Sequence, residues 1–161
     1  MKPYFLDDAV WAKAEPVMRS WLGTPYRHLW MKKGRGADCS LFIGAILLEL
    51  GIVNEVKHEF YPPDWFLHST DLEIVRDGFA NQIRGTMVAG FELVELGQGE
   101  ALMRGDMPTF CTVPETGVTN HAGIMLDTKT FIHSAKGRGV SEMSWGNYWA
   151  RCATAIYRVV C

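Results

Sequence analysis

Gly34-Arg35-Gly36-Ala37-Asp38-Cys39-Ser40-Leu41-Phe42 is the stretch that decides how this chain folds, because a glycine-rich approach leads one cysteine into an apolar run. The run continues to Leu50 and is followed by Gly51. Glycine is favoured in the left-handed position that ends many helices. The pattern therefore predicts a nearly buried helix over residues 39–50.

Asp38 stands where a helix cap is expected, because its carboxylate can accept hydrogen bonds from the free amides of the first turn. Cys39 then lies among those amides, near the positive end of the helix dipole. Such a place favours thiolate over thiol, so we expect the pKa of Cys39 to fall below its free value of about 8.5. Free cysteine is also among the most buried residue types. From this stretch alone, a nucleophile and a small core residue are both open.

Length and composition place the chain among ordinary globular domains. Its 161 residues fit one domain, 1–161, with a single core. A formal net charge of −2 with 21% charged residues indicates neither a nucleic-acid-binding protein nor one strongly attracted to membranes. The N-terminus lacks a signal-peptide core and no run reaches the ~18 apolar residues of a membrane span. We expect synthesis in the cytoplasm without a signal peptide.

Cysteine spacing indicates free thiols. Cys39, Cys111, Cys152 and Cys161 form no CxxC pair, so neither a disulfide framework nor a thiolate zinc knuckle is indicated. We expect all four to be reduced and the chain to need no cofactor or metal.

Two further helices are predicted in the first half of the chain. One covers residues 7–22, where Pro16 indicates either a kink or a helix that begins near Pro16. The other covers residues 71–84, with Gly85 as its stop. Residues 88–96 are typical of a short strand or a helical turn.

After Asp106 the apolar period changes to two and turn residues recur, which predicts a run of short strands. They are expected at about 107–113, 121–126, 130–135, 139–144 and 154–160. Helices followed by a meander of strands indicate an α+β fold.

Two histidines in these strands are candidates for a base and its partner. If Asp127-Thr128-Lys129 forms a three-residue loop, Gly123 pairs with His133, and His121 shares a face with His133. A two-residue loop would place the two histidines on opposite faces. We expect the three-residue loop, which gives the cysteine a base and that base an orienting group.

Other interpretations of these residues stay open at this point. Each histidine alone fits a satisfied, half-buried side chain, and a Cys/His/His zinc site lacks the short ligand spacings of structural zinc. Residues 27–36 mix basic groups with aromatics and would wall a cleft, or Trp30 covers the helix end. His28, His58 and His68 are given no role. Trp145, Tyr148 and Trp149 would form an apolar patch.

The chain resembles the NlpC/P60 cysteine peptidases in five separated blocks that follow the order of that family. They are Gly23-Thr24-Pro25-Tyr26, Ala37-Asp38-Cys39-Ser40, Arg104-Gly105-Asp106, His121-Ala122-Gly123-Ile124 and Phe131-Ile132-His133-Ser134. The resemblance spans residues 9–160. It implies a papain-like α+β core in which N-terminal helices, including the helix bearing the cysteine, pack on a small antiparallel β-sheet bearing the histidines.

The resemblance implies hydrolysis of peptidoglycan stem peptides between D-γ-glutamate and a diamino acid. It assigns Cys39 as nucleophile, His121 as general base and His133 as the group that orients His121. It places Tyr26 near the thiolate, as an aid to the oxyanion or to substrate position. Asp38 and Ser40 match positions that contact the peptide in relatives.

Two departures qualify the resemblance. Leu41 stands where many relatives have glycine, and the targeting modules of many relatives are absent. The second departure is accompanied by the segment Tyr61-Pro62-Pro63-Asp64-Trp65, which lies inside an insertion at about 52–100. In these two features the chain resembles a compact branch of the family that is found in phage and prophage tails. This branch implies tail proteins as partners and delivery to the cell wall on a tail.

Three hypotheses about function follow. The first is the cell-wall peptidase. The second keeps the fold but makes the chain an amidase or acyltransferase on another substrate. The third is a non-catalytic tail or interaction module, in which exposed aromatics such as Trp65, Trp145 and Trp149 serve an interface.

Overall fold

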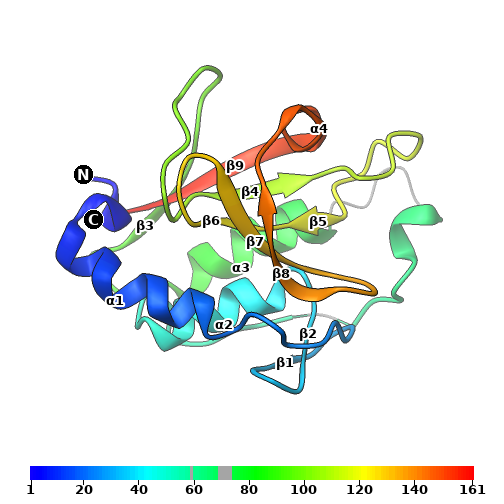
Figure 1. Cartoon of the computed structure of the whole chain (residues 1–161), viewed down its shortest axis with the longest axis horizontal. Coiled ribbons are helices and arrows are strands. Elements are labelled where there is room, and N and C mark those ends of the chain that lie inside the picture. The colour runs from blue at the N-terminus through cyan, green and yellow to red at the C-terminus, as the bar shows by residue number, and fades with distance from the viewer. Residues whose placement is uncertain (59, 69–73) are drawn as a thin grey trace.

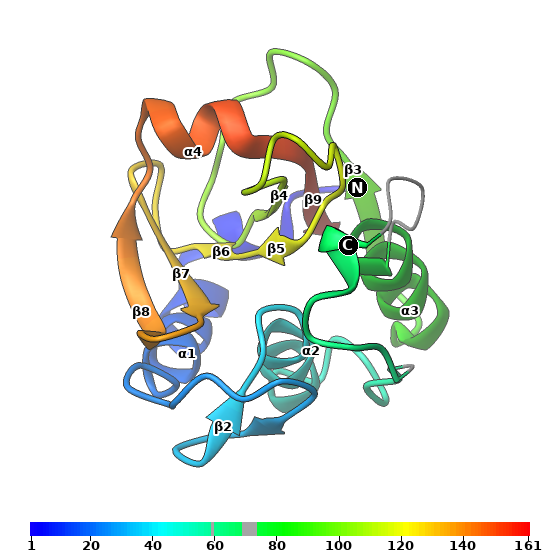
Figure 2. The same cartoon turned by 90° about the vertical axis from the view of Figure 1, so that its right-hand side faces the viewer.

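The apolar run after Cys39 forms helix α2 (Leu41–Glu49) in a computed structural model that describes residues 1–58, 60–68 and 74–161. Most of α2 is buried, and Gly51 has the left-handed φ of 71° that the predicted helix end requires. Figure 2 shows α2 between α1 and α3, beneath the strands. The predicted buried helix is therefore present at the centre of the helical layer, but it begins at Leu41 and not at the predicted residue 39, so Cys39 and Ser40 precede it.

Helix α1 (Asp8–Arg19) follows a 3-10 turn, η1 (Tyr4–Leu6), and is capped by the Asp7 carboxylate, which accepts from two first-turn amides. The helix runs through Pro16, so the alternative of a helix that begins near Pro16 is wrong. Proline leaves the carbonyl four residues earlier without its N–H donor. That residue, Ala12, is exposed, so water can satisfy its carbonyl while the opposite face packs on the core.

The predicted helix 71–84 is divided in the structure. Residues 71–73 lie outside the described residues, η3 (Ile74–Gly78) is a π-helical turn, and α3 spans Phe79–Thr86. Gly85 lies inside α3, so its prediction as the stop is wrong. The Thr86 hydroxyl donates to the carbonyls of Gln82 and Ile83, and these bonds help close the last turn of the helix.

The strands form antiparallel sheets whose order differs from a simple meander. One sheet has the order β3-β9-β4-β5, another β6-β7-β8, and β1 pairs with β2. The strands are β1 (Met31–Lys32), β2 (Gly36–Ala37), β3 (Glu92–Glu95), β4 (Met107–Phe110), β5 (His121–Ala122), β6 (Ile124–Met125), β7 (Thr130–Ala135), β8 (Gly139–Ser144) and β9 (Ala153–Val160). The C-terminal strand β9 therefore lies between β3 and β4, where a meander would have placed sequence neighbours.

Gly123 divides the predicted strand 121–126 into β5 and β6, which belong to different sheets. A Cβ at this glycine would lie 2.7 Å from the Phe131 ring, so no larger residue fits without movement. The amide of Gly123 still donates to the Pro108 carbonyl. The chain therefore passes from one sheet to the other at the point where Gly123 touches β7.

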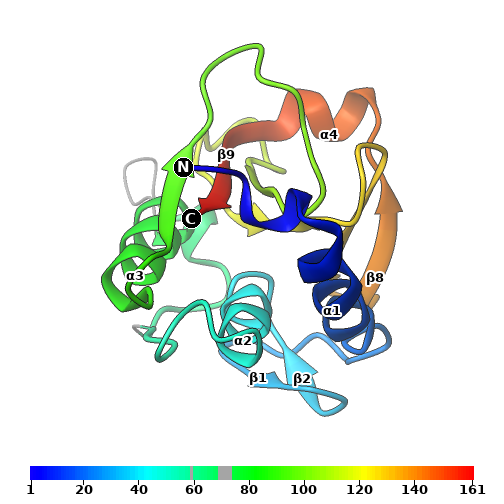
Figure 3. The same ribbon diagram turned by 90° about the vertical axis from the view of Figure 1, so that its left-hand side faces the viewer.

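The two layers and the ends of the chain are clear in the three views. Figure 1 shows α1 and α2 on one side of the strands and α4 (Asn147–Cys152) on the other. The six-residue α4 was not predicted, because it is too short for a helical period to stand out. Figure 3 shows the two termini close together, where Lys2 and Cys161 exchange backbone hydrogen bonds of 2.8 and 3.0 Å.

Asp106 and Arg158 form a buried ion pair that explains one of the five sequence blocks. The Arg158 guanidinium donates to both Asp106 oxygens at 2.7 Å, and the Asp106 side chain is almost fully enclosed. Beside it, Gly105 lies so close to Phe5 that a Cβ would overlap the ring. Arg104 donates to the carbonyls of Phe5 and Leu6. This block therefore joins β4 to β9 and to the N-terminal turn.

Within the described residues, no helix combines the length and apolar character needed to cross a membrane.

Candidate active site

Asp38 organises the loop that precedes α2. One carboxylate oxygen accepts from the amides of Ser40 and Leu41 at 3.1 and 2.7 Å, and the other accepts from Leu29 at 3.1 Å. Leu29 adopts a left-handed φ of 59°, which is rare for a residue of this kind. The predicted hydrogen bonds from the following amides to Asp38 are present, but the N-cap residue of α2 is Ser40, two residues after the predicted cap. Because Asp38 is buried and both its oxygens are used, its contact with a peptide stays a prediction.

Cys39 lies against the strand that carries His121. Its side chain is only 8% exposed, and Sγ approaches the Asn120 carbonyl at 3.9 Å. Backbone N–H groups of Ala122, Cys39 and Ser40 also face the sulfur. The thiol is therefore enclosed by main-chain groups on both sides of His121.

The pKa of Cys39 is raised, which corrects the predicted lowering. Burial is the main cause, and the nearby negative charge of Asp38 adds to it. The backbone N–H groups that face the sulfur lower the pKa, but by less than burial raises it. A helix N-terminus stabilises a thiolate only where the loss of hydration is small, and here the sulfur is enclosed. The resting group is therefore a thiol.

His121 and His133 meet as the three-residue loop predicts. The register of β6 with β7 pairs Ile124 with Ile132 and Met125 with Phe131, and the Leu126 amide donates to the Thr130 carbonyl. The same register places Gly123 opposite His133. Nε2 of His121 lies 2.8 Å from Nδ1 of His133. The three-residue loop and the shared face of the two histidines are therefore confirmed.

Both histidine rings lie in aromatic surroundings that oppose their protonation. Burial lowers the pKa of His121 to about 3, with the charge of His133 as the second cause. Burial also lowers the pKa of His133 to about 4, and Arg138 adds to the effect. The Trp149 ring lies 5.3 Å from His133 and 6.0 Å from His121. Cys39 and His121 thus rest as a neutral thiol and a neutral imidazole, and the thiolate expected at Cys39 is not the resting form.

The predicted apolar surface patch near the C-terminus is largely absent. Trp145 and Trp149 are partly buried against a small cluster built on Phe110, Met125 and Phe131. Tyr148 alone of the three is well exposed, at 52%. Trp65, also proposed as an exposed interface residue, is 6% exposed. Trp145 and Trp149 are covered because α4 lies over this small cluster, whereas Trp65 packs in the main core beside Tyr61 and Phe66.

Tyr26 lies beside the candidate nucleophile, as expected. Burial raises the pKa of its phenol, and electrostatic interaction with Cys39 and Asp38 adds to this effect. Tyr26 also forms an isolated parallel bridge with Ala37, two residues before the cysteine. A contact between Tyr26 and an oxyanion or substrate stays a prediction.

Tyr61 is a site residue that the sequence did not reveal. Its phenol interacts with Ser40, and the pKa of the phenol is raised by burial and by electrostatic interaction with Asp38 and Cys39. His28 binds the Tyr61 carbonyl at 2.6 Å and packs edge-on to its ring. His28, which had no predicted role, thus fixes the insertion to the loop before Cys39. The only signal was the stiffness of Tyr61-Pro62-Pro63, which does not point to a partner.

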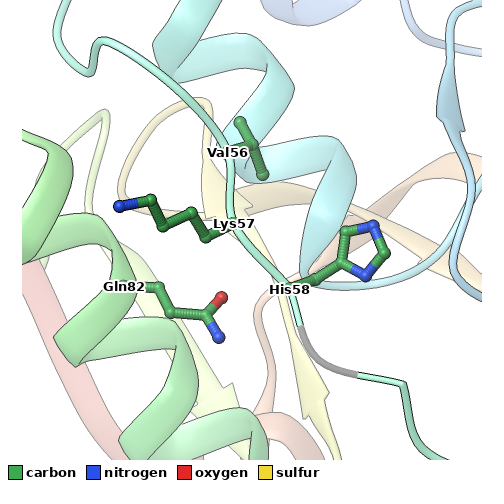
Figure 4. Close-up of a pocket in the computed structure, with 4 residues that line it drawn as sticks. All are labelled: Val56, Lys57, His58 and Gln82. Carbon is green, nitrogen blue, oxygen red and sulfur yellow. The ribbon is translucent and has the colours of Figure 1, made fainter.

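No cluster of three or more His, Cys, Asp or Glu side chains among the described residues is placed to bind a metal ion. All four cysteines are free. A cavity of about 570 Å³ opens between α3 and the segment after α2, and its described lining is Val56, Lys57, His58 and Gln82 (Figure 4). None of these lining residues belongs to the site around Cys39.

The fold is similar to solved structures of NlpC/P60 proteins. A lipoprotein-like member of this family from Staphylococcus aureus has a TM-score of 0.62 at 18% identity, over 100% of this chain and 45% of that one. A Bacillus cereus family protein has a TM-score of 0.57 at 19% identity, over 89% of this chain and 39% of that one. The chain thus spans less than half the length of either structure. The predicted α+β fold, with helices packed on small antiparallel sheets, is confirmed.

The likeness to these two structures concerns the fold. No protein-family profile and no curated protein match the sequence.

Proposed function

We propose that this chain is a cysteine peptidase that hydrolyses peptidoglycan stem peptides, at the bond between D-γ-glutamate and a diamino acid. One observation carries the proposal. The Cys39 thiol lies against the backbone on both sides of His121, and His121 is hydrogen-bonded to His133. A nucleophile, a base and a group that orients the base are the parts that acyl transfer requires.

Proton transfer accompanies the attack in this mechanism. The Nε2 atom of His121 is engaged by His133, which leaves Nδ1 to accept the thiol proton. Because burial raises the pKa of Cys39 and lowers that of His121, the pair is neutral before substrate binds. The sulfur attacks the amide carbonyl as His121 takes its proton, so His121 acts as a general base.

The tetrahedral intermediate then collapses. The carbonyl oxygen gains negative charge, and backbone N–H groups near the sulfur, with the Tyr26 hydroxyl, are the donors available to it. His121 returns the proton to the leaving amine, and a thioester forms on Cys39. Water, deprotonated by His121, releases the acid product and restores the thiol.

The substrate class rests on the five sequence blocks and on a fold shared with NlpC/P60 structures. A papain-like core also suits an amidase or an acyltransferase that uses the same thioester. The test must therefore identify the product as well as detect turnover. In the proposal no cofactor takes part.

The test is mass spectrometry of muropeptides after incubation with the purified chain. We expect products with a new amine on the diamino acid and none with Cys39→Ala, whereas Cys161→Ala, which changes an exposed thiol, digests like the parent. Digestion by Cys39→Ala at the parental rate overturns the proposal. Turnover that yields a different product identifies an amidase or acyltransferase. No turnover of any wall peptide by the folded parent identifies a non-catalytic module.

We include in the proposal that the protein works in a phage or prophage tail, where tail proteins are its partners. The support is the resemblance of the Tyr61-Pro62-Pro63-Asp64-Trp65 segment to compact tail-associated relatives. Co-sedimentation of the tagged chain with purified tail particles tests this part. A chain that stays in the soluble fraction at every particle concentration contradicts it.

A further inference from the structure

Ser141 lies directly opposite His133 in the hairpin of β7 and β8. Residues that face each other in an antiparallel pair have their Cβ atoms about 4.5–5.5 Å apart and project from the same side of the sheet. Ser141 is therefore the cross-strand neighbour of the histidine that holds His121.

Both members of this pair carry a buried polar atom that no described residue satisfies. These atoms are Nε2 of His133 and Oγ of Ser141. A third such atom, Nε1 of Trp21, belongs to the turn after α1. Buried polar groups are almost always hydrogen-bonded, to protein or to ordered water. Two unsatisfied atoms on one cross-strand pair can satisfy each other, through a rotation of the serine hydroxyl or a bridging water.

The proton chemistry requires such a partner for His133. When His121 accepts a proton at Nδ1, its Nε2 carries hydrogen and donates to Nδ1 of His133. His133 must then keep its own proton on Nε2, where it needs an acceptor. The Ser141 hydroxyl belongs to the residue that the register pairs with His133, and it too lacks a hydrogen-bond partner among the described residues.

We propose that Ser141 is a positioning residue that holds His133 in the tautomer protonated at Nε2. The hydroxyl accepts from Nε2 and so keeps Nδ1 free as the acceptor for His121. Arg138 is the charged group that acts on His133, and its positive charge keeps the ring neutral, so that the Ser141 hydroxyl has only to select between the two neutral tautomers. The proposal rests on the proposed function for its catalytic meaning, but the tautomer itself is a property of the resting protein.

The test compares Ser141→Thr with Ser141→Val, because these side chains have nearly the same shape and differ by the hydroxyl. Nitrogen-15 spectra of the histidine rings report which nitrogen of His133 carries the proton. We expect the Nε2 tautomer in the parent and in Ser141→Thr, and a mixture of tautomers in Ser141→Val. Ser144→Val, on the exposed part of the same strand, serves as the matched control. Thermal melts of all variants verify that each is folded.

The same variants should also differ in catalysis. We expect kcat to fall about 3- to 10-fold in Ser141→Val, which is the usual effect of one hydrogen bond, with KM unchanged. In Ser141→Thr, kcat should return to the parental value. An unchanged tautomer in folded Ser141→Val overturns the inference. A parent chain with no peptidase activity contradicts the proposed function, whereas a tautomer that depends on Ser141 still supports the inference. The two failures are thus distinguishable.

Discussion

Nε2 of His121 lies 2.8 Å from Nδ1 of His133, although 12 residues separate them in the chain. The contact exists because a three-residue loop sets the register of β6 with β7, and because Gly123 lets the chain pass close to Phe131. The candidate base is thus positioned by the main chain of a hairpin. Cys39 approaches the same residues from the helical layer.

Replacement of His121 should reduce activity more than replacement of His133. We expect His121→Gln to lower kcat/KM by about 10³-fold, because it removes the general base. His133→Gln should cost about 10- to 100-fold, since its amide can still accept from His121 and hold the ring. Single-turnover hydrolysis of a stem peptide measures both. Equal losses in the two variants would show that His133 does more than orient His121.

Stability should fall as the pH falls below about 6.5. Unfolded histidines bind protons near that pH, whereas His121 and His133 stay neutral in the fold down to about pH 3 and 4. The unfolded state therefore binds more protons in this window, and each histidine lowers the unfolding free energy by at most about 1.4 kcal/mol per pH unit. Urea denaturation at several pH values measures the slope. We expect the His68→Gln variant, changed at an exposed position, to keep the slope of unfolding free energy against pH. The double variant His121→Gln, His133→Gln should have a flatter slope.

Trp149 should hold both histidines in their neutral forms. Its ring covers His121 and His133, so Trp149→Ala admits water and should raise both pKa values toward 6.5. Titration of the histidine ring protons by NMR measures the change. Tyr148→Ala, at the exposed neighbour, is the matched control and should leave the titrations as they are. Unchanged histidine pKa values in folded Trp149→Ala would contradict this role.

Tyr61 should contribute to substrate binding from the insertion. Its phenol interacts with Ser40 beside the candidate nucleophile Cys39, and a Tyr61→Phe change removes that interaction but keeps the packing against His28 and Trp65. We expect KM to rise about 3- to 10-fold, as for one lost hydrogen bond, with little change in thermal stability. Phe60→Ala, at a side chain that is 86% exposed, should leave KM unchanged. A KM equal to that of the parent in Tyr61→Phe would place the phenol outside the substrate site.

Asp106→Asn should destabilise the fold far more than Glu100→Gln, although both carboxylates approach Arg158. Asp106 is enclosed and bidentate, so its loss leaves a buried guanidinium without its counter-charge, at a cost of about 3 kcal/mol. Glu100 lies 3.8 Å away with a half-exposed side chain, so its loss should cost less than about 1 kcal/mol. Chemical denaturation of the two variants measures their free energies of unfolding. Similar losses would mean that burial does not govern this cluster.

Local sequence patterns predicted most of the elements but fewer of their ends. The bounds of β7 and β8 match their predictions, since alternating apolar residues lie between clear turns. Helix α3 passes the predicted stop at Gly85, because side-chain bonds from Thr86 support its last turn. Pro16 does not break α1, because Ala12, whose carbonyl it leaves without a donor, is exposed and within reach of water. Both wrong predictions have the same cause. Tertiary packing or solvent can satisfy a backbone hydrogen-bonding group that the local sequence pattern treats as unsatisfied.

The sequence by itself determined the buried helix after Cys39, the hydrogen bonds from its first amides to Asp38 and the face that His121 and His133 share, because helical period, capping chemistry and strand parity act over short distances. Only the tertiary structure decided the charge state of the site, because desolvation depends on what encloses a group and not on its neighbours in sequence. It also brought Tyr61 to Ser40 and Trp149 onto the histidines. These contacts join segments far apart in the chain, and no local pattern specifies them.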